Sequence, residues 1–285
     1  MAAMTAAGCV STASADQADA LPLKPARALL VMLRRLRVHW TVNFDAKLGC
    51  GAVEIEDVVA DGVLPAEMEV LLVAVKNEIV TGVIDAVTKA GLEPVIADVD
   101  YFALENMFEL NYPEEKKNTV ALINVGARFS SINIMQDGES LFAGDVSVGS
   151  RLYTDALCET LGMQPLEAEQ AKTGKVPPNF DANLVSETIE RTTEHVVSEL
   201  QRQLGFYWNA AATDRAIESI YISGGGAQVE GLIEELHART GSACKLIESF
   251  RQVDWSANFD KDFIREIEPA MGVSVGLAVR RLGDK

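Results

Sequence analysis

Histidine and cysteine are scarce in this sequence, and neither is spaced for metal binding. Only three histidines occur among 285 residues, at the widely separated positions His39, His195 and His237. The four cysteines show no metal or redox spacing, which predicts reduced thiols in a cytosolic compartment. They are Cys9, Cys50, Cys158 and Cys244. We therefore expect no metal site built from these residues.

Basic residues are also few. The chain has 25 Lys and Arg against 42 Asp and Glu, a formal net charge of −17. This balance argues against a general nucleic-acid-binding surface and against a surface that binds anionic membranes. The net charge does not exclude a local basic patch.

No apolar run is long enough to cross a membrane. Residues 26–38 are apolar and basic, but the run Leu29 to Leu33 is too short for a span or a signal peptide. A packed strand or helix, or an amphipathic surface helix, fits them instead. Residues 1–20 are rich in Ala, Ser and Thr without periodicity, which predicts a disordered tail. Ala6 to Cys9 is similar to a lipoprotein cleavage site, but no charged start and no strongly apolar run precede it.

What the sequence does contain is a globular core. Hydrophobic residues make up 48% and charged residues 24%, as in soluble globular proteins. Residues 38–44 alternate between apolar and polar, which predicts a strand, and the apolar run at 69–77 predicts a buried strand. Residues 78–94 predict a helix with Ile79, Val83, Val87 and Ala90 on one face. A strand at 94–100 and a helix at 101–111 complete an α/β unit. The polar turn at 111–118 predicts a domain boundary.

The stretch from 119 to 149 predicts a three-stranded meander. Val120 to Val125, Phe129 to Met135 and Glu139 to Ala143 are the strands, and Asp137-Gly138 is a two-residue hairpin turn. The first corner, Gly126-Ala127-Arg128, is a loop of small residues. We expect a helix to begin near Gly149.

Helices and a second glycine loop follow. Helices are predicted at 149–162, 165–174 and 184–211, with a loop at 175–179. The strand Ser219 to Ser223 runs into Gly224-Gly225-Gly226 and a helix, a geometry in which backbone passes close to a bound ring or phosphate. A tightly packed connection without a ligand fits the glycines equally well. Residues 244–249 predict a strand, and 268–282 a terminal helix in which Gly272 and Gly276 allow close approach of another element.

Several blocks together resemble one family. They read VLLVAVKNEIVTGVIDAVTKAGLEPVIADVDYFALENMF, ALINVGARFSSINIMQDGESLFAGDVSVGSRLYTDALCETLG, EAEQAKTG, LQRQLGFYWNA, YISGGGAQVEGL and PAMGVSVGLAVR. In order and spacing they are similar to the FtsA branch of actin-like ATPases, and within it to the PilM family of type IV pilus assembly, over about residues 66–282. The resemblance implies an α/β actin-like ATPase (ribonuclease H-like) fold.

The resemblance also implies a domain organisation. Nothing in residues 1–50 resembles the Asp-Ile-Gly-Ser-Ser strand pair with which family members open, and VEIEDVVADGV is a weak remnant of the inserted subdomain. We expect a tail at 1–27, a partial first domain at 28–113, and a complete second domain at 114–285 with a long-helix subdomain at about 165–215.

In the family, the two loops hold ATP and Mg²⁺. By resemblance the nucleotide-binding residues are Asn124, Gly126, Ala127, Arg128, Ser130, Ser131, Gly224, Gly225 and Gly226. Asn124 stands where the family has an Asp, and a neutral amide is a weaker partner for a hard cation. Because ATP hydrolysis needs phosphates clamped from both sides and a bound metal, we expect residual ATP binding at most, no efficient hydrolysis and no catalytic residues. In the alternative, both loops are inherited turns without a ligand.

The resemblance implies a cytoplasmic scaffold, peripheral to the inner membrane, that binds the cytoplasmic tail of PilN. The family's groove for that peptide lies in the first half, where Val70 to Val75 and the following helix are its wall. Self-association is a further possibility. The alternatives are an active ATPase or kinase, and an FtsA-like membrane tether, for which residues 282–285 provide no linker and amphipathic anchor.

Overall fold

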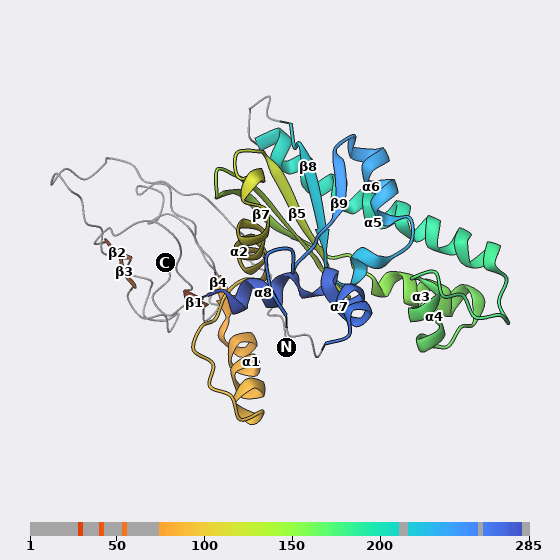
Figure 1. Ribbon diagram of the computed structural model, residues 1–285, viewed down its shortest axis with the longest axis horizontal. Coiled ribbons are helices and arrows are strands. Elements are labelled where there is room, and N and C mark those ends of the chain that lie inside the picture. The colour runs from red at the N-terminus through yellow and green to blue at the C-terminus, as the bar shows by residue number, and fades with distance from the viewer. Residues whose placement is uncertain are drawn as a thin grey trace. The chain divides into compact units, whose positions relative to one another are not determined.

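The computed structural model describes residues 28–30, 40–42, 53–55, 74–210, 216–255 and 259–280 (Figure 1). The chain divides into two compact units, Met1–Val99 with Arg280–Lys285, and Asp100–Val279. The predicted tail at 1–27, most of the subdomain remnant and the first part of the strand predicted at 69–77 lie outside the described residues.

The described residues of the first unit form two short strand pairs and one helix. β1 (Ala28–Leu30) pairs antiparallel with β4 (Ala74–Lys76), and β2 (Trp40–Val42) pairs antiparallel with β3 (Val53–Ile55). α1 (Asn77–Lys89) follows β4 and ends before Gly91, whose φ of 78° is left-handed, so the predicted helix and its stop are confirmed.

The strand predicted at 94–100 is wrong. Residues 92–99 form no regular element, and Val95 is 61% exposed. A strand exists only where a neighbour completes its hydrogen bonds, and no described strand lies beside this segment. The β-branched residues of this segment are therefore not sufficient by themselves to make it a strand.

The second unit is built on a five-stranded sheet in the order β7-β6-β5-β8-β9. β5 (Val120–Val125), β6 (Ser130–Gln136) and β7 (Glu139–Val146) form the predicted antiparallel meander, which is confirmed. Its hairpin turns at Asp137 and Gly138, with φ of 55° and 77°, as a two-residue turn with two left-handed residues requires. β8 (Ser219–Ser223) lies parallel to β5, and β9 (Ala243–Leu246) parallel to β8.

Helices cover both faces of this sheet. On one face pack α3 (Arg151–Leu161), α4 (Pro165–Ala171), α5 (Ala182–Ala210) and α6 (Leu232–Thr240). On the other face pack α2 (Asp100–Asn111) and α8 (Gly272–Ala278). The predicted helices at 101–111, 149–162, 165–174 and 184–211 are confirmed, and Figure 1 shows the long α5 extending past the sheet.

The two cores follow from strand alternation. Ile123 and Ile132 face α3, α5 and α6, where they pack with Tyr153, Leu200, Leu232 and other buried side chains. Leu122 and Tyr221 face α2 and α8, where they pack with Leu104, Phe108 and Val275. Nearly every residue of β5 is therefore buried, as in a central strand covered on both sides.

The C-terminal segment differs in detail from its prediction. The single helix expected at 268–282 is a 3₁₀ turn η5 (Glu268–Met271) followed by α8. α7 (Lys261–Ile267) was not predicted, although Asp260 caps it by accepting from the amides of Asp262 and Phe263. Two further 3₁₀ turns are η3 (Pro113–Glu115) and η4 (Gly225–Gln228).

Gly276 lets α8 cross α2 at very close range. A Cβ atom on Gly276 would overlap the carbonyl group of Ala103, and one on Gly272 would lie 2.6 Å from Ser223 Oγ and 2.7 Å from Leu104 Cδ1. The predicted close approach at this glycine pair is thus confirmed, and the neighbour at Gly276 is rigid backbone.

None of the helices in the described ranges is long and apolar enough to cross a membrane.

We expect Gly276→Ala to destabilise the protein by about 1–3 kcal/mol, because the added methyl group must push two helix backbones apart. Gly205→Ala is the matched control: Gly205 lies inside α5 with open space around its Cα, and alanine there should stabilise by up to about 1 kcal/mol. Urea unfolding followed by circular dichroism measures both. Equal stability of Gly276→Ala and wild type would show that the close crossing is unnecessary.

Candidate nucleotide site

The two predicted glycine loops meet at one edge of the sheet. Asn124 of β5 lies beside Ser223 of the parallel strand β8, so both strands end at the same place and release their loops together. Gly224 has a φ of 94°, and a Cβ atom there would lie 2.7 Å from Asn124 Oδ1 and closer still to the carbonyl oxygen of Val125. The close approach of the two loops therefore requires glycine at 224.

Gly226 is packed as tightly. A Cβ atom on it would lie 2.5 Å from Val125 Cγ1 and 3.0 Å from Ser150 Cβ. Gly225, by contrast, is exposed with open space around it. Of the three glycines, two are needed for packing between the loops and one faces outward.

The loop after β5 binds its own neighbours. The amide of Gly126 donates to the carbonyl of Phe129 at 3.0 Å. The amides of Ser150 and Arg151, which open α3, donate to the carbonyls of Gly126 and Ala127 at 2.9 and 2.8 Å. Free amides at a helix start are a common anion site. Here they are already occupied by backbone carbonyls.

The two serines of β6 are buried, and their hydroxyls are committed internally. Ser130 Oγ donates to the carbonyl of Val148 at 2.8 Å, and Ser131 Oγ donates to Asp100 Oδ2 at 3.3 Å. Both side chains sit on a strand that is covered on each face. Their hydroxyls would have to leave these partners to reach a phosphate.

A row of polar side chains crosses the sheet beside the loops. The strand register aligns Asp145, Ser131, Asn124 and Ser223, and residues directly opposite in a sheet point to the same face. Asp100, in the first turn of α2, reaches the row through Ser131. Asp100 and Asp145 were not among the predicted site residues. The register of the predicted hairpin could have placed Asp145 in this row. The position of Asp100 could not be predicted in this way, because it depends on how α2 packs.

Burial raises the pKa of the Asp100 carboxyl above its ordinary value, while hydrogen bonds from the Tyr101 amide and the Ser131 hydroxyl oppose the shift. Burial is the largest of these causes because taking a charge out of water is costly. Neutral Asp100 is a poor ligand for a cation. Across the described residues, no three His, Cys, Asp or Glu side chains are grouped so as to hold a metal ion.

A buried lysine supports the start of α3. Lys172 Nζ donates to the carbonyl of Ser150 at 3.3 Å, to Thr154 Oγ1 at 3.1 Å and to Glu169 Oε1 at 2.8 Å. An ammonium group has three donors, and all three are used. The sequence predicted only a short helix for this segment. Lys172 holds Ser150, whose amide in turn holds the Gly126 loop.

What remains free at the loops is limited. Ala127 and Arg128 are exposed, and Arg128 makes no ion pair within the described part of the chain. Asn124 is half-buried and keeps its amide at the row. The site thus offers a ligand the Arg128 guanidinium, the Asn124 side-chain amide, and the backbone amides of Ala127, Arg128 and Gly225.

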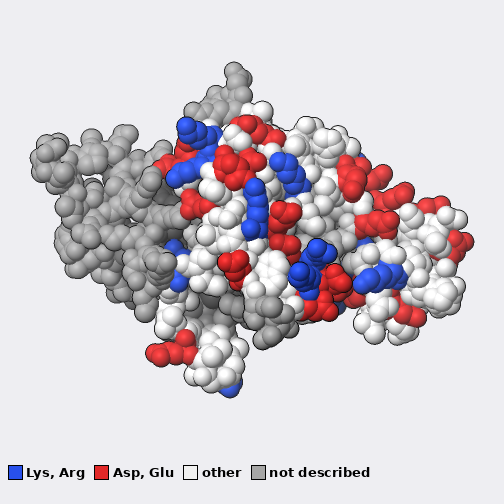
Figure 2. Space-filling model, viewed as in Figure 1, with Lys and Arg blue, Asp and Glu red and all other residues white. Residues whose placement is uncertain are grey.

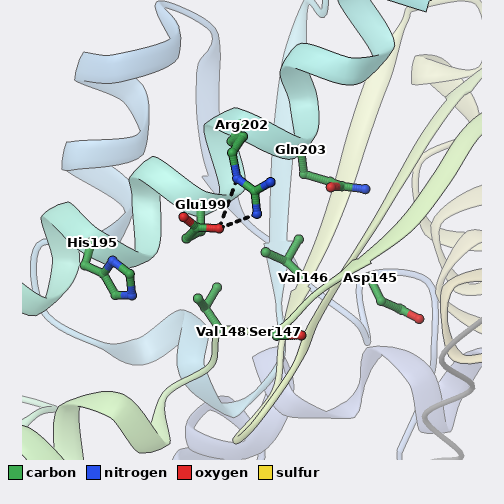
Figure 3. Close-up of a pocket in the computed structure, with 8 residues that line it drawn as sticks. All are labelled: Asp145, Val146, Ser147, Val148, His195, Glu199, Arg202 and Gln203. Carbon is green, nitrogen blue, oxygen red and sulfur yellow. Dashed lines mark hydrogen bonds and ion pairs between the residues drawn. The ribbon is translucent and has the colours of Figure 1, made fainter.

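A hollow of about 340 Å³ lies between the end of β7 and α5 (Figure 3). It is lined by Asp145, Val146, Ser147, Val148, His195, Glu199, Arg202 and Gln203. None of the nine predicted nucleotide-binding residues lines it. His195, which the sequence places among polar neighbours, is exposed.

The sheet order, the two loops and the helices on both faces define a protein of the actin-like ATPase fold. The structure of MreB5 of Spiroplasma citri bound to ADP shares this fold, with 11% sequence identity, a TM-score of 0.51, and an alignment covering 72% of this chain and 65% of that one.

A match to a sequence model identifies the family within this fold. The sequence model of the type IV pilus assembly protein PilM matches residues 55–282, so the chain belongs to the PilM family. The solved PilM–PilN type IV pilus biogenesis complex is similar over 96% of this chain and 76% of that chain, with 20% identity and a TM-score of 0.72.

We expect Asp100→Asn to raise stability at neutral pH. Below the ordinary carboxyl pKa of about 3.9, Asp100 is protonated in both folded and unfolded chains, and the variant has no advantage. As pH rises through the raised pKa of the folded state, wild type loses stability that the asparagine keeps.

Thermal unfolding from about pH 4 to pH 8 measures this difference. Asp155→Asn is the control, since that carboxylate is on the surface of α3 with a side chain 53% exposed, and its ion pair with Arg151 contributes little. An Asp100→Asn variant less stable than wild type at pH 7 would contradict the expectation.

Proposed function

We propose that the chain is a scaffold of the type IV pilus inner-membrane assembly complex, which binds the cytoplasmic tail of PilN and has weak or lost ATP binding. Family membership and the similarity to a PilM–PilN complex support the assembly role. Binding to PilN would keep the protein peripheral to the inner membrane.

One observation supports the non-catalytic part of the proposal: the serine hydroxyls beside the loop and the first amides of the helix after it are already bonded within the chain. The amides of Ser150 and Arg151 bind loop carbonyls, and the hydroxyls of Ser130 and Ser131 bind Val148 and Asp100. Binding a triphosphate there would first break these bonds, each worth about 1 kcal/mol net.

The residues present also do not fit a magnesium–nucleotide clamp. Position 124 supplies an amide where a carboxylate is needed, and burial favours the neutral form of Asp100. Hydrolysis requires a metal and clamping from two sides. The chain therefore does not catalyse hydrolysis in this proposal, and its fold serves to bind a protein partner.

The proposed peptide groove belongs to the first half. Of its predicted wall, Ala74–Lys76 is strand β4 and α1 follows it directly, while residues 70–73 lie outside the described ranges. A strand followed by a helix with one apolar face is a surface on which an extended peptide can lie.

We expect Mg-ATP to leave the melting temperature unchanged, for wild type and for Asn124→Asp alike. A ligand at 100 times its Kd would stabilise by about 2.7 kcal/mol, a shift of several degrees. Differential scanning fluorimetry with millimolar nucleotide measures this. A saturable rise in wild type would establish a working site. A rise restricted to Asn124→Asp would show that only the carboxylate is missing.

We expect a synthetic peptide of the PilN cytoplasmic tail to bind equally with and without ATP. Isothermal titration calorimetry measures the affinity, and a scrambled peptide of the same composition is the control. If the peptide releases or absorbs no heat at any concentration tested, the proposed partner is wrong for this chain. Binding that depends on ATP would overturn the nucleotide-independent role.

A further inference from the structure

The chain passes twice between its two units. The first passage lies between Val99 and Asp100, where α2 begins, and the second lies between Val279 and Arg280, just after the end of α8. Two connections of this kind move independently of each other unless something joins them. The contacts on either side of the two passages therefore decide whether the connections move together.

Within the second unit, helix packing joins the two connections. Gly276 of α8 lies against the backbone of Ala103 in α2. One turn earlier in α8, a Cβ atom on Gly272 would lie 2.7 Å from Leu104 Cδ1, which comes later in α2. The two helices therefore run past each other in opposite directions, in close contact where they lead to the two passages.

Within the first unit, an ion pair joins the two connections. Arg280 Nε lies 2.9 Å from Asp98 Oδ2, and the two side chains are only 16% and 3% exposed. The contact is an ion pair and not an aligned hydrogen bond. The other oxygen of Asp98 accepts from the Val99 amide at 2.9 Å, which holds the carboxylate in front of α2.

The burial of this pair sets it apart from charges at the surface. Figure 2 shows acidic and basic side chains next to one another on the visible face of the molecule. Exposed ion pairs contribute little, because water screens them. Asp98 and Arg280 are largely removed from water, so losing one charge would leave the other uncompensated. The pair therefore constrains the two segments that carry it.

Both connections are also attached to the edge of the sheet where the glycine loops lie. In the first turn of α2, Asp100 accepts from Ser131 Oγ. α8 follows η5, in which the Pro269 carbonyl accepts from the Gly224 amide at 2.7 Å and from Ser223 Oγ at 2.9 Å. A displacement at this edge would therefore act on the two connections.

We propose that the Asp98–Arg280 ion pair locks the two connections together, so that a displacement of α2 or of α8 is shared by the other. The packing at Gly276 joins them within the second unit, and the ion pair joins them within the first. The two passages then act as a single joint. This lock requires neither PilN nor nucleotide.

Hydrogen–deuterium exchange of the full chain tests the lock, read by mass spectrometry in peptides covering residues 100–107 and 270–279. Arg280→Gln should speed exchange about tenfold at 100–107, and Asp98→Asn should do so at 270–279, because each variant frees the opposite connection. The asparagine keeps an acceptor for the Val99 amide. Peptides from β6 and α5 should exchange as in wild type.

Three further variants sharpen the test. The double variant Asp98→Asn/Arg280→Gln should have no larger effect than either single variant, since all three lose the same interaction. Arg280→Lys keeps the charge and should keep most of the protection. Arg265→Gln is the matched control: it breaks an ion pair with Asp262 whose side chains are 77% and 92% exposed, and both peptides should exchange as in wild type.

Four results would overturn the proposal. Faster exchange confined to the mutated connection would show that the two connections move independently, and so would additive effects in the double variant. Faster exchange throughout β6 and α5 would show that the pair only stabilises the fold. Wild-type exchange in both single variants would show that the pair constrains neither connection.

Discussion

The parallel pairing of β5 with β8 is the interaction on which the second unit depends. It joins two strands that lie far apart in sequence and so closes a long loop, at an entropic cost that the buried residues on both faces must offset. Because parallel strands end at the same edge, the pairing also brings the Gly126 loop against the Gly224 loop. The fold and the candidate site thus have one physical origin.

At that edge the chain satisfies its own polar groups. Buried donors and acceptors without partners are costly, and Ser130, Ser131, Lys172 and the first amides of α3 all find partners within the protein. A site that is complete without a ligand has little to gain from binding one. This is the structural reason for the proposal that the chain does not turn over nucleotide.

The outer strand behaves differently. β7 keeps an edge for which the described sheet has no further strand, and Gly144 permits α5 to stand close beside it. The interior of the fold is therefore closed, whereas the outer side of β7 has no partner strand among the described residues.

The sequence alone determined the elements whose signals are local. Alternation and the Asp137-Gly138 turn predicted the meander, the spacing of apolar residues predicted α5, and the order of blocks predicted the family. It could not determine whether residues 94–100 form a strand, because a strand depends on a neighbour. Nor could it show that Ser131 bonds to Asp100, or that the amides of α3 are occupied. Those facts follow from strand register and helix packing, which arise from contacts between residues distant in the chain. Only the tertiary structure therefore decided that the serine hydroxyls beside the predicted phosphate loop bond within the protein.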